Sequence, residues 1–171
     1  IIGGRLPFLG GNSCVGNSEI MVCEACEYVD TFLQLTPAVS VILNIDADHL
    51  DYFKTLDNII HSFRQFASQT TKRLVVNGDD GNTAKAIEGI PLPVATFGLK
   101  DTNDYYAGNI AEKKGVCEEF ALMHRGEKLA DIVLSVPGEH NIYNALAAAA
   151  TAHTLGVSPE DIAKSLHAFT G

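Results

Sequence analysis

The densest cluster of potentially reactive side chains lies in Asn44–Asp51 (NIDADHLD), where one imidazole, His49, stands among three carboxylates and one amide. The segment begins at the end of Val39–Ile45, an apolar run rich in β-branched residues that predicts a strand covered on both faces. Its polar side chains would emerge at the carboxyl end of that strand, where open α/β sheets bind ligands. This pattern could hold a divalent cation and its phosphate ligands, whereas the plain alternative is a polar loop before a helix.

A second acidic segment lies upstream. Glu24 follows the apolar run Glu19–Cys23, which we predict to be a short strand. If this strand lies beside the one described above, Glu24 and His49 would emerge at the same edge of the sheet. They could then share a magnesium ion, which usually takes few protein ligands. Glu27 and Asp30 are close enough in the sequence to be the ligands instead, and a plain surface role for Glu24 is the other alternative.

The third segment, Gly138–Asn144 (GEHNIYN), opens an alanine-rich helix that we predict over 141–155, with Gly156 placed to end it. Asn141 and Asn144 are three residues apart and would share one face of this helix. Amides carry both donors and acceptors, which suits recognition of the edge of a purine. The alternatives are simple helix capping by Asn141 and a solvated face for Asn144.

A phosphate-binding loop of the G-x-x-x-x-G-K-[ST] type is missing from the sequence. Gly3-Gly4 and Gly10-Gly11 lack the lysine and the hydroxyl, and the turn at 78–81 (GDDG) has the wrong charge for a phosphate. We therefore expect that this chain alone is not an autonomous NTP-using enzyme.

The elements that must position these segments alternate between strand and helix. Apolar residues three and four apart predict a helix over 56–68, and a short helix is predicted over 83–88. Strands are predicted over 73–77 and 94–97. This alternation predicts an α/β fold whose mainly parallel sheet is flanked by helices.

The pattern changes after residue 104. Short runs over 105–136, broken at 113–115 and 125–128, predict a small antiparallel β-meander. A last helix is predicted to start at Ser158-Pro159, with a serine cap and acids in its first turn, and to run towards Phe169. With 171 residues, the chain is long enough for one well-packed domain.

The composition narrows the class of protein. The formal net charge of −9 argues against a nucleic-acid partner, and no run approaches the ~20 apolar residues of a membrane-spanning helix. Cys23 and Cys26 form a C-x-x-C pair that would suit a redox or zinc protein, but Cys14 and Cys117 stand alone and supply no second pair. We expect ordinary reduced cysteines in a cytoplasmic protein.

Taken together, these segments resemble the Mur ligase family. The run 23–33 (CEACEYVDTFL) resembles the E-x-x-E-x-D-x-x-F-L stretch of the alanine-adding member. The run 44–51 matches the family's N-I-x-x-D-H-x-D motif, and 137–145 (PGEHNIYNA) matches its P-G-x-H-N-x-x-N-A motif. The order, the spacing and the closing Phe169–Gly171 agree as well, so the resemblance covers nearly the whole chain.

The resemblance implies the central ATP-binding domain of an amide ligase of peptidoglycan synthesis, spanning 1–171. ATP and Mg²⁺ would be required, and the substrates would be UDP-N-acetylmuramate and L-alanine. The substrate carboxylate would take the γ-phosphate of ATP to become an acyl phosphate, which the amine of L-alanine would then attack.

The resemblance also implies roles for individual residues. Glu24 and His49 would be the catalytic groups and would hold the metal, with Asp48 orienting His49. Asn44 would face the ligand cleft. The adenine side would be lined by a set at the start of the predicted helix: His140, Asn141 and Asn144.

The sequence departs from the family's pattern in several ways. The UDP-substrate domain, the phosphate loop and the domain that closes over the amino acid are missing, so the chain is expected to start just beyond the loop and to depend on these missing domains. Cys26 stands where an acid is common in the family. We expect the isolated chain to fold without catalysing. The rival interpretations are another Mur, muropeptide-recycling or folylpolyglutamate-type ligase, and a non-catalytic binding domain on the same scaffold.

Overall fold

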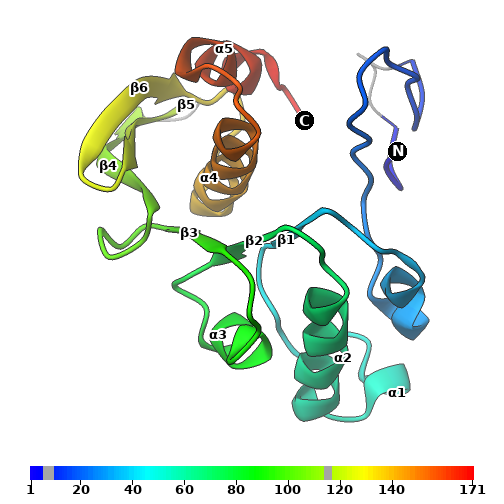
Figure 1. Cartoon of the computed structure of the whole chain (residues 1–171). Coiled ribbons are helices and arrows are strands. Elements are labelled where there is room, and N and C mark those ends of the chain that lie inside the picture. The colour runs from blue at the N-terminus through cyan, green and yellow to red at the C-terminus, as the bar shows by residue number, and fades with distance from the viewer. Residues whose placement is uncertain (6–9, 114–116) are drawn as a thin grey trace.

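The computed structural model describes the backbone of residues 1–5, 10–113 and 117–171, and within them six strands form one sheet in the order β1-β2-β3-β4-β5-β6 (Figure 1). The strands are β1 Val39–Ile42, β2 Arg73–Asn77, β3 Val94–Gly98, β4 Tyr105–Lys113, β5 Cys117–His124 and β6 Glu127–Val133. β1 to β4 pair in parallel, and β4 to β6 pair antiparallel. The mainly parallel sheet and the antiparallel meander are both confirmed.

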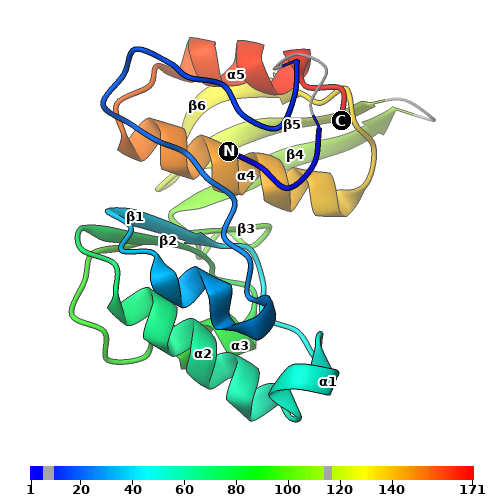
Figure 2. The same cartoon turned by 90° about the vertical axis from the view of Figure 1, so that its right-hand side faces the viewer.

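Helices cover the two faces of the sheet, as Figures 1 and 2 show. They are η2 Tyr28–Gln34, α1 Leu50–Phe53, α2 Leu56–Ser68, α3 Gly81–Ile87, α4 Glu139–Thr154 and α5 Pro159–Ala168. Successive residues of β2 serve opposite faces: Val75 packs in the cluster under α4, and Leu74 and Val76 pack in the cluster with α2 and α3. The continuous apolar sequence of β2 follows from this double coverage.

The helix ends follow local capping chemistry. Thr55, Asp80 and Ser158 accept hydrogen bonds from backbone N–H groups in the first turns of α2, α3 and α5. Gly156, at φ 87°, follows the end of α4 in the left-handed conformation that glycine favours. Helix α2 has the bounds predicted from the sequence. Helix α3 begins at Gly81 rather than at the predicted Thr83, because Asp80 is its cap.

The antiparallel half turns tightly between β5 and β6. Arg125 and Gly126 both have positive φ, as a two-residue hairpin turn requires, so the turn predicted at 125–128 is confirmed. Most of the turn predicted at 113–115 lies outside the described residues.

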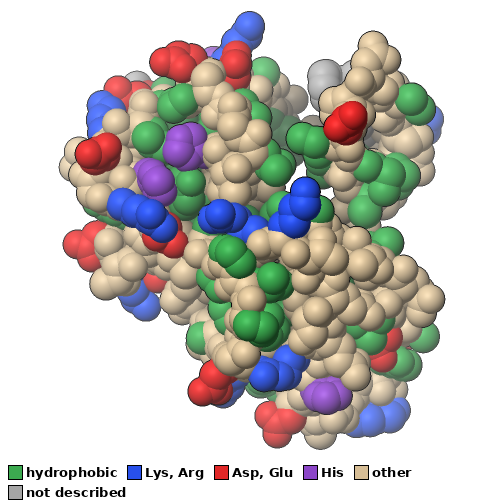
Figure 3. All heavy atoms as spheres, in the orientation of Figure 1, with side chains coloured by type: hydrophobic (Ala, Val, Ile, Leu, Met, Phe, Trp, Pro, Cys, Tyr) green, Lys and Arg blue, Asp and Glu red, His purple; other side chains and the backbone are tan. Residues whose placement is uncertain are grey.

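Two predicted strands differ from the structure. The predicted strand Glu19–Cys23 is wrong: this run pairs with no strand among the described residues, and Ile20, Met21 and Val22 are 56%, 72% and 75% exposed. Its apolar composition therefore does not reflect burial here. In Figure 3 the N-terminal segment stands apart from the α4–α5 layer, across a notch.

The other strand is shorter than predicted. β1 stops at Ile42 rather than Ile45, because the next backbone groups bond side chains instead of the sheet ladder. The Leu43 carbonyl accepts from Asn77 Nδ2 and the Ile45 N–H donates to Asp80 Oδ2. No helix among the described residues is long and apolar enough to cross a membrane.

Candidate functional site

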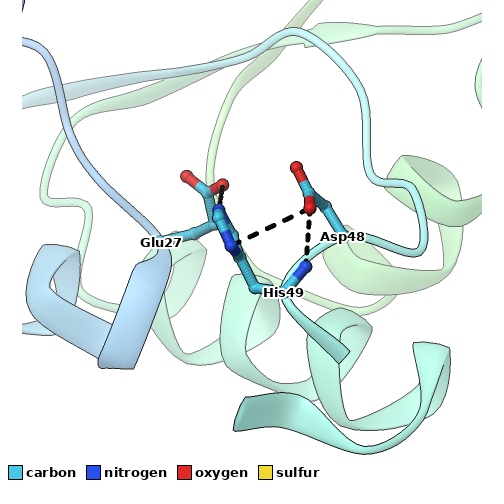
Figure 4. Close-up of side chains that lie close together, drawn as sticks. All are labelled: Glu27, Asp48 and His49. Carbon is cyan, nitrogen blue, oxygen red and sulfur yellow. Dashed lines mark hydrogen bonds and ion pairs between the residues drawn. The ribbon is translucent and has the colours of Figure 1, made fainter. Parts of the chain in front are cut away.

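A carboxylate–imidazole cluster lies beyond the carboxyl end of β1, formed by Glu27, Asp48 and His49 (Figure 4). His49 Nε2 lies 3.3 Å from Glu27 Oε1, and His49 Nδ1 lies 3.8 Å from Asp48 Oδ1. The side chains of His49 and Glu27 are 35% and 33% exposed, so the cluster is open to a ligand. One potential ligand atom from each residue lies within 4.8 Å of the others, which is compatible with a shared cation.

Local backbone conformation orients His49. The residue caps α1 with φ 51°, a left-handed conformation that is uncommon for residues other than glycine. Asp48 Oδ1 accepts a hydrogen bond from the His49 backbone N–H at 2.7 Å, which stabilises this turn. The His49 ring also lies against the Tyr28 ring, with 4.8 Å between ring centroids. Asp48 is therefore placed to support His49.

The segment that carries Glu27 is anchored through Asp30. Tyr52 donates a hydrogen bond to Asp30 Oδ2 at 2.6 Å, and Ser62 on α2 donates to the other carboxylate oxygen. Val29 and Asp30 themselves have positive φ inside η2. Glu27 therefore reaches His49 from a strained turn that is tied to α2.

Glu24 lies elsewhere in the structure. Its Oε2 accepts a hydrogen bond from the Gly3 backbone N–H at 2.6 Å, and it is not a member of the Glu27–Asp48–His49 cluster. The expectation that Glu24 shares an edge with His49 assumed a strand over 19–23 that does not form. The catalytic and metal roles of Glu24 stay predictions, whereas Glu27, the alternative named from the sequence, is the acid that contacts His49.

Asn44 is exposed between two backbone groups that are held in place. The Leu43 carbonyl accepts from Asn77 at 3.0 Å, and the Ile45 carbonyl accepts from Asn82 Nδ2 at 2.9 Å. The structure thus places Asn44 at the carboxyl edge of the parallel strands, and its predicted contact with a ligand stays a prediction.

The predicted amide pair lies at the start of α4. Asn144 Nδ2 donates to Asn141 Oδ1 at 3.4 Å, so the two side chains share a face as expected. Asn141 Nδ2 donates to the Pro137 carbonyl at 2.7 Å. The cap position is Gly138, without a side-chain cap, so the helix-capping alternative for Asn141 is not what the structure has.

Gly138 and His140 form a close contact at this helix start. Gly138 has φ 102°, and a Cβ there would lie 2.7 Å from His140 Cε1. A side chain at position 138 would therefore be strained at this φ and would also push the His140 ring away, which explains the glycine ahead of this helix. The predicted role of His140 at an adenine ring is untested.

Sequence reasoning missed Asp79, which follows β2. Its Oδ2 accepts hydrogen bonds from the Leu99 N–H at 2.6 Å and from the Tyr143 hydroxyl at 3.1 Å. Partial burial alone would raise the pKa of Asp79, but these bonds and one from Asn103 outweigh it and hold the pKa below its usual value. Burial and the Asp79 charge raise the pKa of Tyr143 to about 12, so its hydroxyl stays a donor. The acidic turn at 78–81 is the feature of the sequence that could have drawn attention to Asp79.

Cys14, Cys23 and Cys26 are free thiols, and the Glu27–Asp48–His49 cluster contains no cysteine. Among the described residues, therefore, no disulfide and no cysteine-containing metal cluster supports the redox or zinc interpretation of the C-x-x-C pair.

The fold and the edge cluster together define an α/β domain with the ligand-binding layout of open parallel sheets. Comparison with known proteins gives its family: residues 8–152 match the Mur ligase middle domain, and the chain belongs to the Mur ligase family.

Relatives of known name cover the whole of this chain. A UDP-N-acetylmuramate–L-alanine ligase of Caldanaerobacter subterraneus is 44% identical over 173 residues, which cover 100% of this chain and 38% of the relative. The ligase of the same name from Agathobacter rectalis is 42% identical over 172 residues, covering 99% of this chain and 38% of the relative. This chain thus spans about 38% of the length of these relatives.

Solved structures agree with the fold. The UDP-N-acetylmuramate-alanine ligase MurC of Thermotoga maritima superposes with a TM-score of 0.82 at 27% identity, covering 99% of this chain and 37% of that one. MurF of Acinetobacter baumannii superposes with a TM-score of 0.73 at 32% identity, covering 84% of this chain and 32% of that one. The predicted family and fold class are confirmed.

Proposed function

We propose that this chain is the nucleotide-handling part of an ATP-dependent ligase that joins L-alanine to UDP-N-acetylmuramate in peptidoglycan synthesis. The observation that carries the proposal is the similarity over the entire chain to ligases of that name, at 44% identity. The complete protein would add a phosphate loop, a UDP-substrate domain and a domain that closes over the amino acid. The 171 residues alone would not catalyse the reaction.

The donor set of the cluster fits Mg²⁺. The Glu27 carboxylate supplies hard oxygen ligands, and Mg²⁺ usually takes one or two protein carboxylates together with water and substrate phosphates. When bound, Mg²⁺ supplies charge neutralisation on the phosphates. In our proposal Glu27 and His49 hold the ion, and Asp48 keeps His49 in its left-handed turn.

The reaction would proceed in two transfers. A carboxylate oxygen of UDP-N-acetylmuramate attacks the γ-phosphorus of ATP, which forms an acyl phosphate and releases ADP. The amine of L-alanine attacks the acyl carbon, a proton leaves the nitrogen, and phosphate departs as the amide bond forms. Asn44 would face the reacting groups, and His140, Asn141 and Asn144 would bind the adenine edge, for which paired amides offer donors and acceptors.

The identity of the amino acid that is added is tested on the complete protein that contains this segment. Phosphate release is followed with ATP, Mg²⁺ and UDP-N-acetylmuramate, adding L-alanine, glycine, D-glutamate or L-glutamate in turn. We expect release that depends on L-alanine. Release with another amino acid would move the protein to a different member of the superfamily. No release from a folded protein with an intact phosphate loop upstream would favour a non-catalytic binding domain.

Matched variants, Glu24→Gln and Glu27→Gln, are compared in the same assay to decide which of the two glutamates is the cation ligand. Each removes one charge and keeps the side-chain size. If Glu27 holds the cation with His49, Glu27→Gln raises the Mg²⁺ concentration for half-maximal activity about tenfold, the weight of one charged ligand. A larger shift in Glu24→Gln would return the ligand role to Glu24.

A further inference from the structure

Residues 77–82 join the end of β2 to the start of α3 (Figure 1) and are called the 77–82 turn below. Its side chains contact both parts of the proposed site. Its consecutive carboxylates Asp79 and Asp80 reach different segments of the chain. Asp80 Oδ2 accepts a hydrogen bond from the Ile45 N–H at 3.0 Å, in the loop that leads to His49. Asp79 Oδ2 accepts one from the Tyr143 hydroxyl at 3.1 Å, near the start of α4.

On the loop side, three side chains of the turn hold the chain on both sides of Asn44. Asn77 Nδ2 donates to the Leu43 carbonyl at 3.0 Å, and Asn82 Nδ2 donates to the Ile45 carbonyl at 2.9 Å. Asp80 completes the set through the Ile45 N–H while it also caps α3. These contacts fix the path of the loop four residues ahead of His49.

On the helix side, Asp79 is a fixed, charged acceptor. Its side chain is 9% exposed, and Asn103 Nδ2 donates to Oδ1 at 3.0 Å while the Leu99 N–H donates to Oδ2 at 2.6 Å. Lys100 contacts the same carboxylate through its backbone N–H and its ammonium group. Tyr143, the partner from α4, is the neighbour of Asn144. The contact therefore ties the helix turn that carries the amide pair to the edge of the sheet.

The surrounding glycines show that this edge is built around the Asp79–Asn103 pair. A Cβ at Gly98 would lie 2.5 Å from both Asp79 Oδ2 and Asn103 Nδ2, and a Cβ at Gly78 would overlap Asn103 Oδ1. Both strand ends must therefore be glycine for the two polar side chains to pack against the backbone.

We propose that the 77–82 turn positions the two ligand-binding parts of the site separately. Asp80 positions the loop that carries His49, and Asp79 together with Tyr143 positions the amide pair of α4. This inference rests on the proposed function, because it assumes that the His49 loop takes the cation and that α4 takes the adenine.

The test measures two equilibrium affinities on the complete protein that contains this segment. ATP affinity is measured by calorimetry in excess EDTA. Cation affinity is measured without nucleotide, using Mn²⁺ as a spectroscopic substitute for Mg²⁺. The variants are Tyr143→Phe and Asp80→Asn. The matched control is Tyr105→Phe, which removes a tyrosine hydrogen bond of 2.9 Å to His153 at the far end of α4.

We expect Tyr143→Phe to weaken ATP about tenfold, the size of one hydrogen bond to a charged group, with Mn²⁺ affinity unchanged. Asp80→Asn should weaken Mn²⁺ by a similar factor and ATP in EDTA by far less. Tyr105→Phe should change neither affinity. Each variant's urea midpoint is recorded, so that loss of folding is separated from loss of positioning.

Equal losses of ATP affinity in Tyr143→Phe and Tyr105→Phe would overturn the proposal, and so would proportional losses of both affinities in Asp80→Asn. A wild-type protein that binds neither ATP nor Mn²⁺ would overturn it together with the proposed function. If the wild type binds both but releases no phosphate with any amino acid, only the proposed function fails, and the unequal losses still decide the positioning roles.

Discussion

The cation cluster and the amide pair are held by different forces. The cluster is carried by turns in which Val29, Asp30, His49 and Lys54 have positive φ, and its contacts are polar and partly exposed. The amide pair is carried by α4, a regular helix whose inner face buries Ile142, Leu146 and several alanines. The helix that carries the amides is therefore held by packing, with the Asp79–Tyr143 hydrogen bond setting its first turns, whereas the cluster depends more on polar contacts between strained turns.

This difference suggests how a ligand would act on each part. Packing fixes α4 before any ligand arrives, so binding there costs little reorganisation. The Glu27 and Asp48 carboxylates lie close to His49 at a partly exposed edge, so a cation there would add favourable contacts to side chains that are held by polar groups. Three measurements on this chain test the contrast, and they follow in decreasing order of the change in stability that we expect.

The largest effect is expected from Leu146→Ala. Leu146, on the inner face of α4, is 0% exposed, and its truncation leaves a cavity in a packed core. We expect the free energy of unfolding to fall by about 2–5 kcal/mol in urea denaturation. The control Leu155→Ala makes the same chemical change at the 42% exposed end of the same helix and should cost much less. Equal costs would mean that packing does not hold α4.

The second effect concerns strain in the cluster. Lys54 ends α1 at φ 71° and ψ −42°, a conformation that glycine adopts more readily. Lys54→Gly should therefore raise the free energy of unfolding by about 1 kcal/mol. The control Lys85→Gly, in helix α3, should lower it by about 1 kcal/mol, because glycine is a poor helix former. A loss of stability in Lys54→Gly would show that this turn is not strained.

The smallest effect is a pH dependence at the far end of α4. Burial, followed by the charges of His153 and Arg125, lowers the pKa of His124 below 6.5. The unfolded chain then binds the proton more tightly than the folded one. The stability that the lowered pKa of His124 contributes is fully present above about pH 6.5 and is lost as the pH falls through the folded pKa.

Urea denaturation of the wild type and of His124→Gln between pH 7.5 and 5 checks this prediction. The variant should lose less stability than the wild type over that interval. His61→Gln, at an exposed position on α2, is the control and should keep the wild-type slope. If His124→Gln also keeps that slope, the ring group of Tyr105, His124 and His153 is not the source of the pH dependence.

Much of the fold could be predicted because local patterns agree with tertiary burial. The spacing of apolar residues over 56–68, the β-branched run at 73–77 and the Ser158-Pro159 helix start each reappear in the structure. The prediction failed at 19–23, where an apolar run has no strand beside it among the described residues. Sequence pattern indicates that a segment can be buried, but it does not supply the partner.

The family motifs, the alternation of strands and helices, and the shared face of Asn141 and Asn144 can be predicted from the amino-acid sequence, because they depend on residue order and helix geometry. Folding brings Glu27 rather than Glu24 into contact with His49, and it joins Asp79 to Tyr143 across 64 residues. The reason is physical: turns with positive φ and side-chain hydrogen bonds to distant backbone direct these groups, and neither leaves a periodic signal in the sequence.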